Sequence, residues 1–186
     1  KHIVEVFQPL GEPKDVLVVG NFQSSGNDRP LSFLSSLAGW FDNTRDRNLA
    51  HKIISKAEEY ISTEKNTLDL HFFYPAKMKL FYEERENPVA LQEAINACLE
   101  QIKIAENASS VFRKEYRDNQ LPLHEGYKQL CIIYEKQGKF DEAIIKMANL
   151  SSLKYTNEKI AGAFSFMILS TEFFVPLTNN VDSGEE

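Results

Sequence analysis

The clearest pattern of apolar and polar positions lies between residues 127 and 150. Its first half carries apolar residues spaced by three and four, which places them on one face of an α-helix: Tyr127, Leu130, Cys131 and Tyr134. Gly138 interrupts the pattern, and the same spacing then resumes at Phe140, Ala143, Ile144, Met147 and Leu150. Ala143 is small enough to let two helix axes approach closely. The stretch therefore predicts a helical hairpin, two antiparallel helices joined by a tight turn at Gly138.

Three stretches nearer the N-terminus show the same helical spacing. Pro30 suits the first position of a helix whose apolar face is formed by Phe33, Leu34, Leu37, Trp40 and Phe41. A second helix is expected from Leu49 to Ile61, paired with the first as a hairpin. A third follows the break at Asn87 and Pro88, with an apolar stripe from Leu91 to Ile102 and a continuation toward Phe112.

Residues 67–86 carry two conflicting patterns. Leu68, Leu70 and Phe72 alternate as in a strand, whereas Met78, Phe81 and Tyr82 repeat as in a helix. Pro75 fits the first turn of a helix that runs to about Glu86, and it equally fits a kink in a longer helix. The sequence alone does not decide between strand and helix over residues 67–72, nor between the two positions of Pro75 in a helix.

The two ends of the chain differ from the middle. Residues 3–7 and 16–19 are rich in β-branched side chains and are separated by Pro9, Gly11 and Pro13, so we expect two short strands followed by a loop over residues 21–30. At the other end, apolar spacing after Asn157 predicts one more helix, and the acidic tail from Thr178 is expected to be disordered.

An internal repeat links the two most periodic regions. Residues 91–95 (LQEAI) correspond to residues 140–144 (FDEAI), and Tyr82 corresponds to Tyr134 in the helix that precedes each of them. Residues 105–121 make the first copy longer than the second. We assign this surplus to an extended second helix and a connecting loop.

The hairpin at residues 127–150 resembles one tetratricopeptide (TPR) repeat. The positions that carry the resemblance are Tyr127, Leu130, Cys131, Tyr134, Gly138, Phe140 and Ala143. It covers residues 78–150 at most, and the surplus at 105–121 departs from the regular repeat length. The stretch from Leu121 to Ile144 is also similar to a segment of uncharacterised bacterial proteins with a TPR-like end, which implies a bacterial, cytosolic origin.

Composition narrows the class of protein. The chain has 186 residues, of which 42% are apolar and 26% charged, values near those of globular domains. Its 27 acidic and 21 basic residues give a net charge of −6, and the basic residues do not cluster. A surface of this kind repels phosphate backbones, so nucleic-acid binding is not expected.

The cysteines and the longest apolar run indicate where in the cell the protein is located. Cys98 and Cys131 lie on predicted apolar helix faces and do not indicate a disulfide framework. The run from Ala161 to Leu177 is shorter than a membrane span requires and contains Glu172, so we interpret it as a buried helix. We therefore expect a cytoplasmic protein without a membrane segment. The chain begins at Lys1, and the question of whether a signal peptide was removed from its start stays open.

Candidate chemistry is sparse. The four histidines are scattered, and neither a metal-binding spacing nor a glycine-rich phosphate loop is present in the sequence. We therefore expect no cofactor, no metal site and no catalytic residues. An enzyme with a site between the N-terminal segment and the helices remains an alternative, and it would use Asp46, His51 or His124.

These patterns predict a mainly α fold of stacked antiparallel helical hairpins, TPR-like, with a short strand-bearing N-terminal segment. The predicted parts are the segment 1–30, the helical domain 31–175 and the disordered tail 176–186. The resemblance implies a non-catalytic module that binds a protein or peptide. Its contact residues would be Lys128, Ile132, Glu135 and Lys136, with Leu80 and Glu83 from the weaker repeat. A structural or oligomerising domain, including a homo-oligomer, is the remaining alternative.

Overall fold

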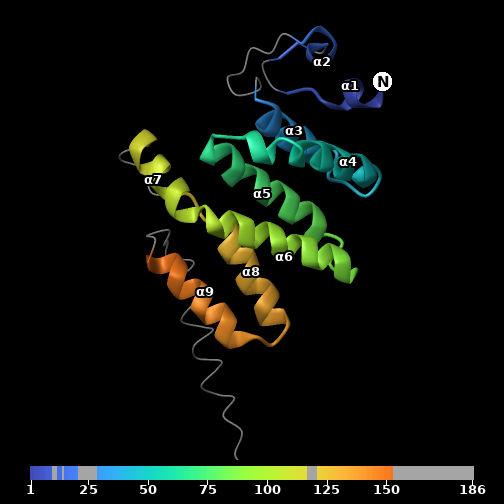
Figure 1. Ribbon diagram of the computed structural model, residues 1–186. Coiled ribbons are helices and arrows are strands. Elements are labelled where there is room, and N and C mark those ends of the chain that lie inside the picture. The colour runs from blue at the N-terminus through green and yellow to red at the C-terminus, as the bar shows by residue number, and fades with distance from the viewer. Residues whose placement is uncertain (10–11, 14, 21–28, 117–120, 153–186) are drawn as a thin grey trace, which may run out of the picture.

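The computed structural model describes residues 1–9, 12–13, 15–20, 29–116 and 121–152, and these residues are mainly helical (Figure 1). The helices are α1 (His2–Val6), α2 (Val16–Val19), α3 (Pro30–Gly39), α4 (Arg47–Glu58), α5 (Thr67–Tyr82), α6 (Pro88–Lys103), α7 (Ala105–Glu115), α8 (Glu125–Lys136) and α9 (Phe140–Ser152), with a 3₁₀ turn at Ile61–Thr63. The described residues contain no β-strand.

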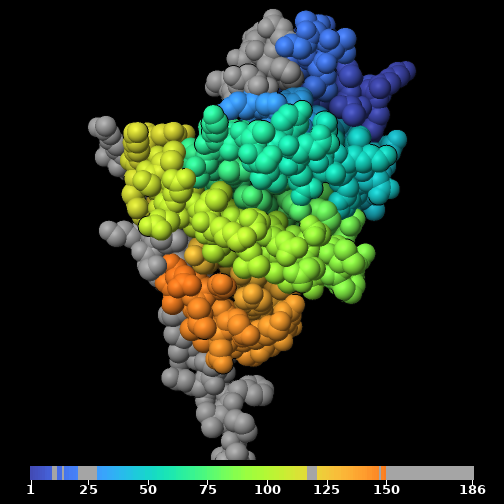
Figure 2. All heavy atoms as spheres, in the orientation of Figure 1, coloured from blue at the N-terminus to red at the C-terminus, as the bar shows by residue number. Residues whose placement is uncertain are grey.

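The larger helices pack in consecutive pairs. α3 packs on α4, α5 on α6 and α8 on α9, and each pair is joined by a short connection. The pairs also contact one another, because α3 packs on α5 and α6 packs on α8. In Figures 1 and 2 the pairs follow one another along the molecule in the order of the sequence. The predicted hairpin at residues 127–150 is confirmed by α8 and α9.

Local sequence signals set where these helices begin and end. The Asn66 side chain accepts a hydrogen bond from the backbone N–H of Leu68 (2.9 Å) at the start of α5. Asn87 does the same for Val89 (2.9 Å) at the start of α6, with Pro88 at the first helical position. α8 ends at Lys136, and the turn that follows contains Gly138, whose φ of 71° lies in the left-handed region that favours glycine.

The conflicting segment 67–86 forms one continuous helix, α5, with Pro75 in its interior. Proline has no N–H, so the carbonyl of His71 one turn earlier lacks its helical donor. The Gln101 side chain of α6 supplies a donor instead, with Nε2 2.8 Å from the His71 carbonyl oxygen. Gln101 is 1% exposed, and its Oε1 accepts from the backbone N–H of Gly126 in α8 at 2.6 Å. One buried amide therefore joins three helices.

The largest core cluster lies at the N-terminal end, where α1 to α5 bury residues such as Phe7, Leu31, Phe41, Ile54 and Phe73. A second cluster continues the core between α5, α6 and α8 through Met78, Cys98 and Leu130. A third lies between α8 and α9 and contains Tyr127, Cys131 and Ala143. Both cysteines are free and buried, so the interpretation of Cys98 and Cys131 as small core residues is confirmed.

The predicted N-terminal strands are wrong. Residues 2–6 and 16–19 form the short helices α1 and α2. β-branched residues favour strands only where a partner strand completes the hydrogen-bonding ladder, and the described residues offer none. The segment is held instead by single buried side chains, such as Phe7, whose ring lies 5.9 Å from that of Phe33 and 5.5 Å from that of Trp40.

The expected extension of the third helix toward Phe112 is also wrong. α6 ends at Lys103, and a separate helix, α7, begins after Ile104, which has left the helical conformation (φ −95°, ψ 1°). α7 packs on α5, where Ala108 and Phe112 bury Leu68. The apolar contact with α5 turns the chain away from the axis of α6.

Several predictions fall on residues outside the described part of the chain: most of the loop 21–30, the helix after Asn157, the apolar run 161–177 and the acidic tail. Among the helices of the described residues, none has the length and apolar character needed to cross a membrane.

Candidate functional site: a pocket between α5, α6 and α8

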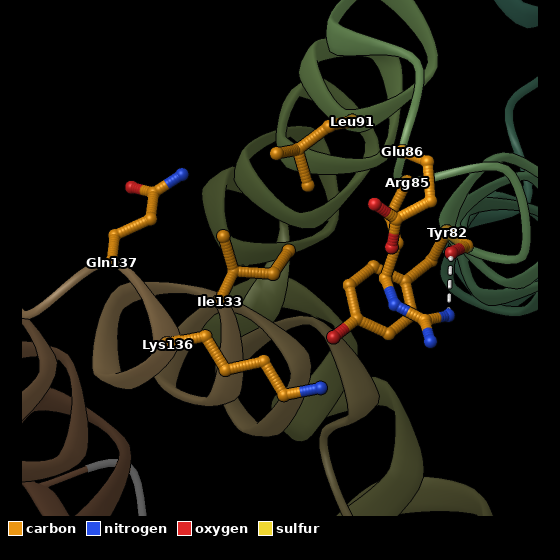
Figure 3. A pocket seen from close by; sticks show the side chains of 7 residues that line it. All are labelled: Tyr82, Arg85, Glu86, Leu91, Ile133, Lys136 and Gln137. Atoms are coloured by element: carbon orange, nitrogen blue, oxygen red, sulfur yellow. Dashed lines mark hydrogen bonds between the residues drawn. The ribbon is translucent and has the colours of Figure 1, made fainter.

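A pocket of about 370 Å³ lies where the ends of α5 and α8 meet the beginning of α6 (Figure 3). It is lined by Tyr82, Arg85, Glu86, Leu91, Ile133, Lys136 and Gln137. Arg85 and Glu86 belong to the turn between α5 and α6, whereas Lys136 and Gln137 belong to the end of α8. The pocket therefore exists only because two successive helix pairs pack together.

Two cationic side chains lie over the ring of Tyr82. The Arg85 guanidinium carbon is 5.0 Å from the ring centroid, and the Lys136 ammonium is 5.8 Å from it. Figure 3 shows Lys136 extending from α8 toward Tyr82, while Arg85 approaches from the α5 side. Arg85 also donates a hydrogen bond to the Tyr82 carbonyl oxygen at 3.3 Å. These contacts hold both positive charges at the pocket.

The polar groups of the pocket are incompletely paired within the part of the chain that the structure describes. Arg85 and Lys136 form no ion pair there, and the buried hydroxyl of Tyr82 has no hydrogen-bond partner. Lys77, by contrast, contacts carboxylates of both Glu58 (2.6 Å) and Glu93 (2.8 Å). The pocket thus holds two cations available to a ligand, beside one buried hydroxyl that has no partner among the described residues.

Apolar and acidic residues complete the lining. Ile133 is buried and Leu91 is half-buried, so they form an apolar wall, while Gln137 and Glu86 are exposed. Glu86 contributes a single negative charge beside the two positive ones. The formal charge of the lining is therefore one positive unit.

The residues predicted to contact a partner are only partly at the surface. Lys128, Glu135 and Lys136 of α8 are exposed, as is Glu83 after α5, and Ile132 is half-buried. Leu80 does not belong to this surface, because its side chain is 2% exposed and packs in the N-terminal core. The sequence pattern left open whether residues 67–86 form a strand or a helix, and it placed Leu80 on the side of α5 that faces solvent, whereas this side chain faces the core.

The residues considered for catalysis are engaged at three different places. Asp46 contacts the imidazole of His2 at 2.9 Å, and His51 contacts Glu84 at 3.1 Å. His124 is 0% exposed and caps the start of α8, where its Nδ1 accepts from the N–H of Tyr127 at 3.4 Å. These side chains do not converge on a common cleft.

His124 belongs to a buried pair of histidines. Its ring lies 5.3 Å from that of His71, which is 2% exposed and also contacts Phe112. Burial lowers the pKa of His71 to about 4, and burial together with the neighbouring His71 lowers the pKa of His124 to about 4. Both imidazoles are neutral at pH 7 and act as packing and capping groups.

Among the described residues, no group of three or more histidine, cysteine, aspartate or glutamate side chains could hold a metal ion.

Comparison with known proteins gave short partial similarities. One segment of 58 residues is 45% identical to a valine–tRNA ligase of Parabacteroides distasonis and covers 31% of this chain and 7% of the ligase. A valine–tRNA ligase of Bacteroides fragilis is 34% identical over 88 residues, 47% of this chain and 10% of the ligase. The chain therefore spans no more than a tenth of the length of these relatives. No protein-family model and no solved structure matches the chain.

Sequence reasoning missed most of the pocket. The sequence pattern gave Arg85 and Glu86 no role in binding, and it used Tyr82 only in the helical spacing and as the counterpart of Tyr134 in the repeat. The correspondence of Tyr82 with Tyr134 could have indicated the pocket, because stacked copies of a repeat bring the α5–α6 turn close to the following helix pair. Lys136 is the one pocket residue that was also predicted to contact a partner.

Proposed function

We propose that the helical part of this chain is a non-catalytic module, built from TPR-like hairpins, that binds a protein or peptide partner. The observation that carries the proposal is the pocket between two successive helix pairs, because it presents unpaired cations and an apolar wall at one place. Pockets in which an apolar surface adjoins a few polar groups are typical binding sites.

The exposed side of α8 extends this pocket into a larger contact surface. Lys128, Ile132 and Glu135 continue the surface from Lys136 along α8, and Glu83 faces solvent after α5. Mixed charges at the rim of an interface contribute more to the choice of partner than to affinity. We expect them to select the partner and the pocket to anchor it.

Affinity purification of the full chain from its native cell tests the proposal. The double variant Lys128→Ala/Lys136→Ala removes two exposed cations from α8 and should reduce recovery of the specific partner about tenfold. Mass spectrometry of the co-eluting proteins measures the recovery.

The matched control is Lys52→Ala/Lys114→Ala, which removes the same charge from exposed positions on α4 and α7. Recovery should be unchanged in this control. Equal recovery by wild type, the double variant and the control would remove the proposal.

A second copy of the chain is one form that the partner can take. Light scattering over a range of protein concentrations measures self-association directly. The proposed setting is the bacterial cytoplasm.

The partial similarity to valine–tRNA ligases favours a second candidate function, contact with tRNA. The net charge of −6 opposes it, since binding to nucleic acid relies on clustered cations. A titration with tRNA at low salt, in which fluorescence anisotropy measures binding, tests this candidate. We expect no binding, and a salt-dependent affinity would establish the second function over the first.

A further inference from the structure

The pocket between α5, α6 and α8 has the features of a site for a negatively charged group. The Arg85 guanidinium and the Lys136 ammonium approach one aromatic ring from two different helix pairs. Contact with the face of a ring does not neutralise a cation. With no ion pair to either cation among the described residues, their charge remains available at the pocket.

The buried hydroxyl of Tyr82 adds a second, independent indication of a ligand. A buried polar atom without a partner is costly, and such atoms are normally satisfied by a ligand or water. The phenolic O–H can donate to an acceptor oxygen, and the two cations can only donate. All three groups therefore suit a ligand that carries acceptor oxygens.

The charge of the lining selects among such ligands. Two cations and the carboxylate of Glu86 leave one positive unit, which matches a monoanion such as a carboxylate. A phosphate ester carries about −1.5 to −2 charges at pH 7, so it would be under-neutralised and repelled by Glu86. Leu91 and Ile133 offer an apolar wall beside the charged groups, as suits a carboxylate carried on an aliphatic stem.

We propose that this pocket binds the side-chain carboxylate of an acidic residue in the partner, with its stem against Leu91 and Ile133. The carboxylate accepts hydrogen bonds from Arg85 and Lys136, and from the buried Tyr82 hydroxyl once the side chains that cover it shift to admit the ligand. This proposal rests on the proposed function and specifies the chemistry that its partner must present.

The test titrates the full chain with short synthetic peptides. Binding is measured from the NMR shifts of the Arg85 and Gln137 side-chain N–H groups. The first peptide has a central glutamate between leucines, with both ends blocked. The second replaces the glutamate by glutamine, the third has glutamine and a free C-terminal carboxylate, and the fourth has phosphoserine at the centre. We expect the first peptide to bind at least about tenfold more tightly than the second, as charged hydrogen bonds require.

Variants locate the effect. Arg85→Gln and Lys136→Gln should each weaken the glutamate peptide about tenfold, and Tyr82→Phe should weaken it less, because it removes one neutral donor. Lys114→Gln removes the same charge from an exposed position on α7 and should leave the affinity unchanged. Thermal unfolding by circular dichroism checks that each variant folds.

Equal binding of the glutamate and glutamine peptides, or an equal loss in Lys114→Gln, would overturn the proposal. Tighter binding of the third peptide would show that the pocket prefers a C-terminal carboxylate to a side-chain carboxylate, which overturns the proposed ligand. Tighter binding of the phosphoserine peptide would refute the assignment of a monoanion. If purification still identifies a partner that depends on Lys128 while the peptides show no glutamate preference, only the pocket assignment falls. If the glutamate peptide binds at the pocket and no partner is recovered, only the proposed function falls.

Discussion

At the scale of single residues, Gln101 joins three helices through one buried amide. Its amide N–H donates to the His71 carbonyl that Pro75 leaves without a helical donor, and its amide oxygen accepts from the backbone N–H of Gly126 at the start of α8. Buried polar groups with both partners in place make a specific junction, and loss of one partner leaves the others unsatisfied. The contact also requires a residue without a side chain at position 126.

Gly126→Ala tests this junction. A Cβ at position 126 would lie 2.7 Å from Gln101 Oε1 and 3.0 Å from the carbonyl oxygen of Cys98, so the bridge must shift. We expect the free energy of unfolding to fall by about 1–3 kcal/mol, measured by urea titration. Gly39→Ala is the matched control, because nothing lies within 4 Å of its added Cβ. An unchanged stability in Gly126→Ala would contradict the role given to Gln101.

The buried histidines predict a dependence of stability on pH. The folded pKa values of His71 and His124, about 4, lie below the unfolded value of 6.5, so between these values the unfolded chain binds more protons. Stability should therefore fall as pH falls from 6.5 toward 4, by up to about 1.4 kcal/mol per pH unit for each histidine. Urea titrations at pH 7 and pH 5 measure the difference.

Two variants separate the histidines from other titrating groups. His71→Leu removes one buried imidazole, and His124→Asn keeps a side-chain acceptor at the start of α8. Each should reduce the pH dependence by about the contribution of one histidine. If the dependence of the free energy of unfolding on pH is the same in both variants as in the wild type, carboxylates elsewhere cause it and the histidines do not.

At the scale of elements, Lys77 of α5 links the two neighbouring helices α4 and α6. Its ammonium contacts Glu58 at the end of α4 and Glu93 in α6, and its side chain is 13% exposed. Burial alone would lower the pKa of Lys77, but hydrogen bonds to the two glutamates outweigh it and raise the pKa. The charge therefore stays on the side chain and draws the two carboxylates together.

Lys77→Ala should lower the free energy of unfolding by about 1–2 kcal/mol, because two partly exposed carboxylates lose their shared partner. Lys56→Ala, which breaks an exposed pair with Glu59 (side chains 55% and 61% exposed), should change stability by less than about 0.5 kcal/mol. Thermal and urea unfolding of both variants measure the contrast. An equal effect of the two substitutions would show that burial does not strengthen the Lys77 contacts.

At the scale of the whole molecule, each helix pair depends on its neighbour in the sequence. The core runs from the N-terminal cluster through Met78, Cys98 and Leu130 to Ala143, and no single pair buries its apolar faces alone. The same packing creates the pocket, whose lining comes from two pairs. The proposed binding at the pocket would therefore depend on the contact between the pairs.

Periodicity in the sequence was sufficient to place the helices that became α3, α4, α6, α8 and α9, because helical spacing and end signals such as Asn87 and Gly138 act over a few residues. It also identified Tyr127, Leu130, Cys131 and Ala143 as buried. It failed where a local pattern admits two conformations. Residues 3–7 and 16–19 have no partner strand within the described part of the chain. Pro75 is accommodated in α5 because Gln101, 26 residues later, replaces the missing donor.

The sequence by itself determined that this chain is mainly helical and which residues form the seam of its last hairpin, since those properties depend on neighbours three or four positions apart. Only the tertiary structure decided that α7 leaves the axis of α6, that Leu80 lies inside the core, and that Tyr82, Arg85 and Lys136 meet. Those outcomes depend on contacts between distant segments, which are set by the packing of whole helices against one another.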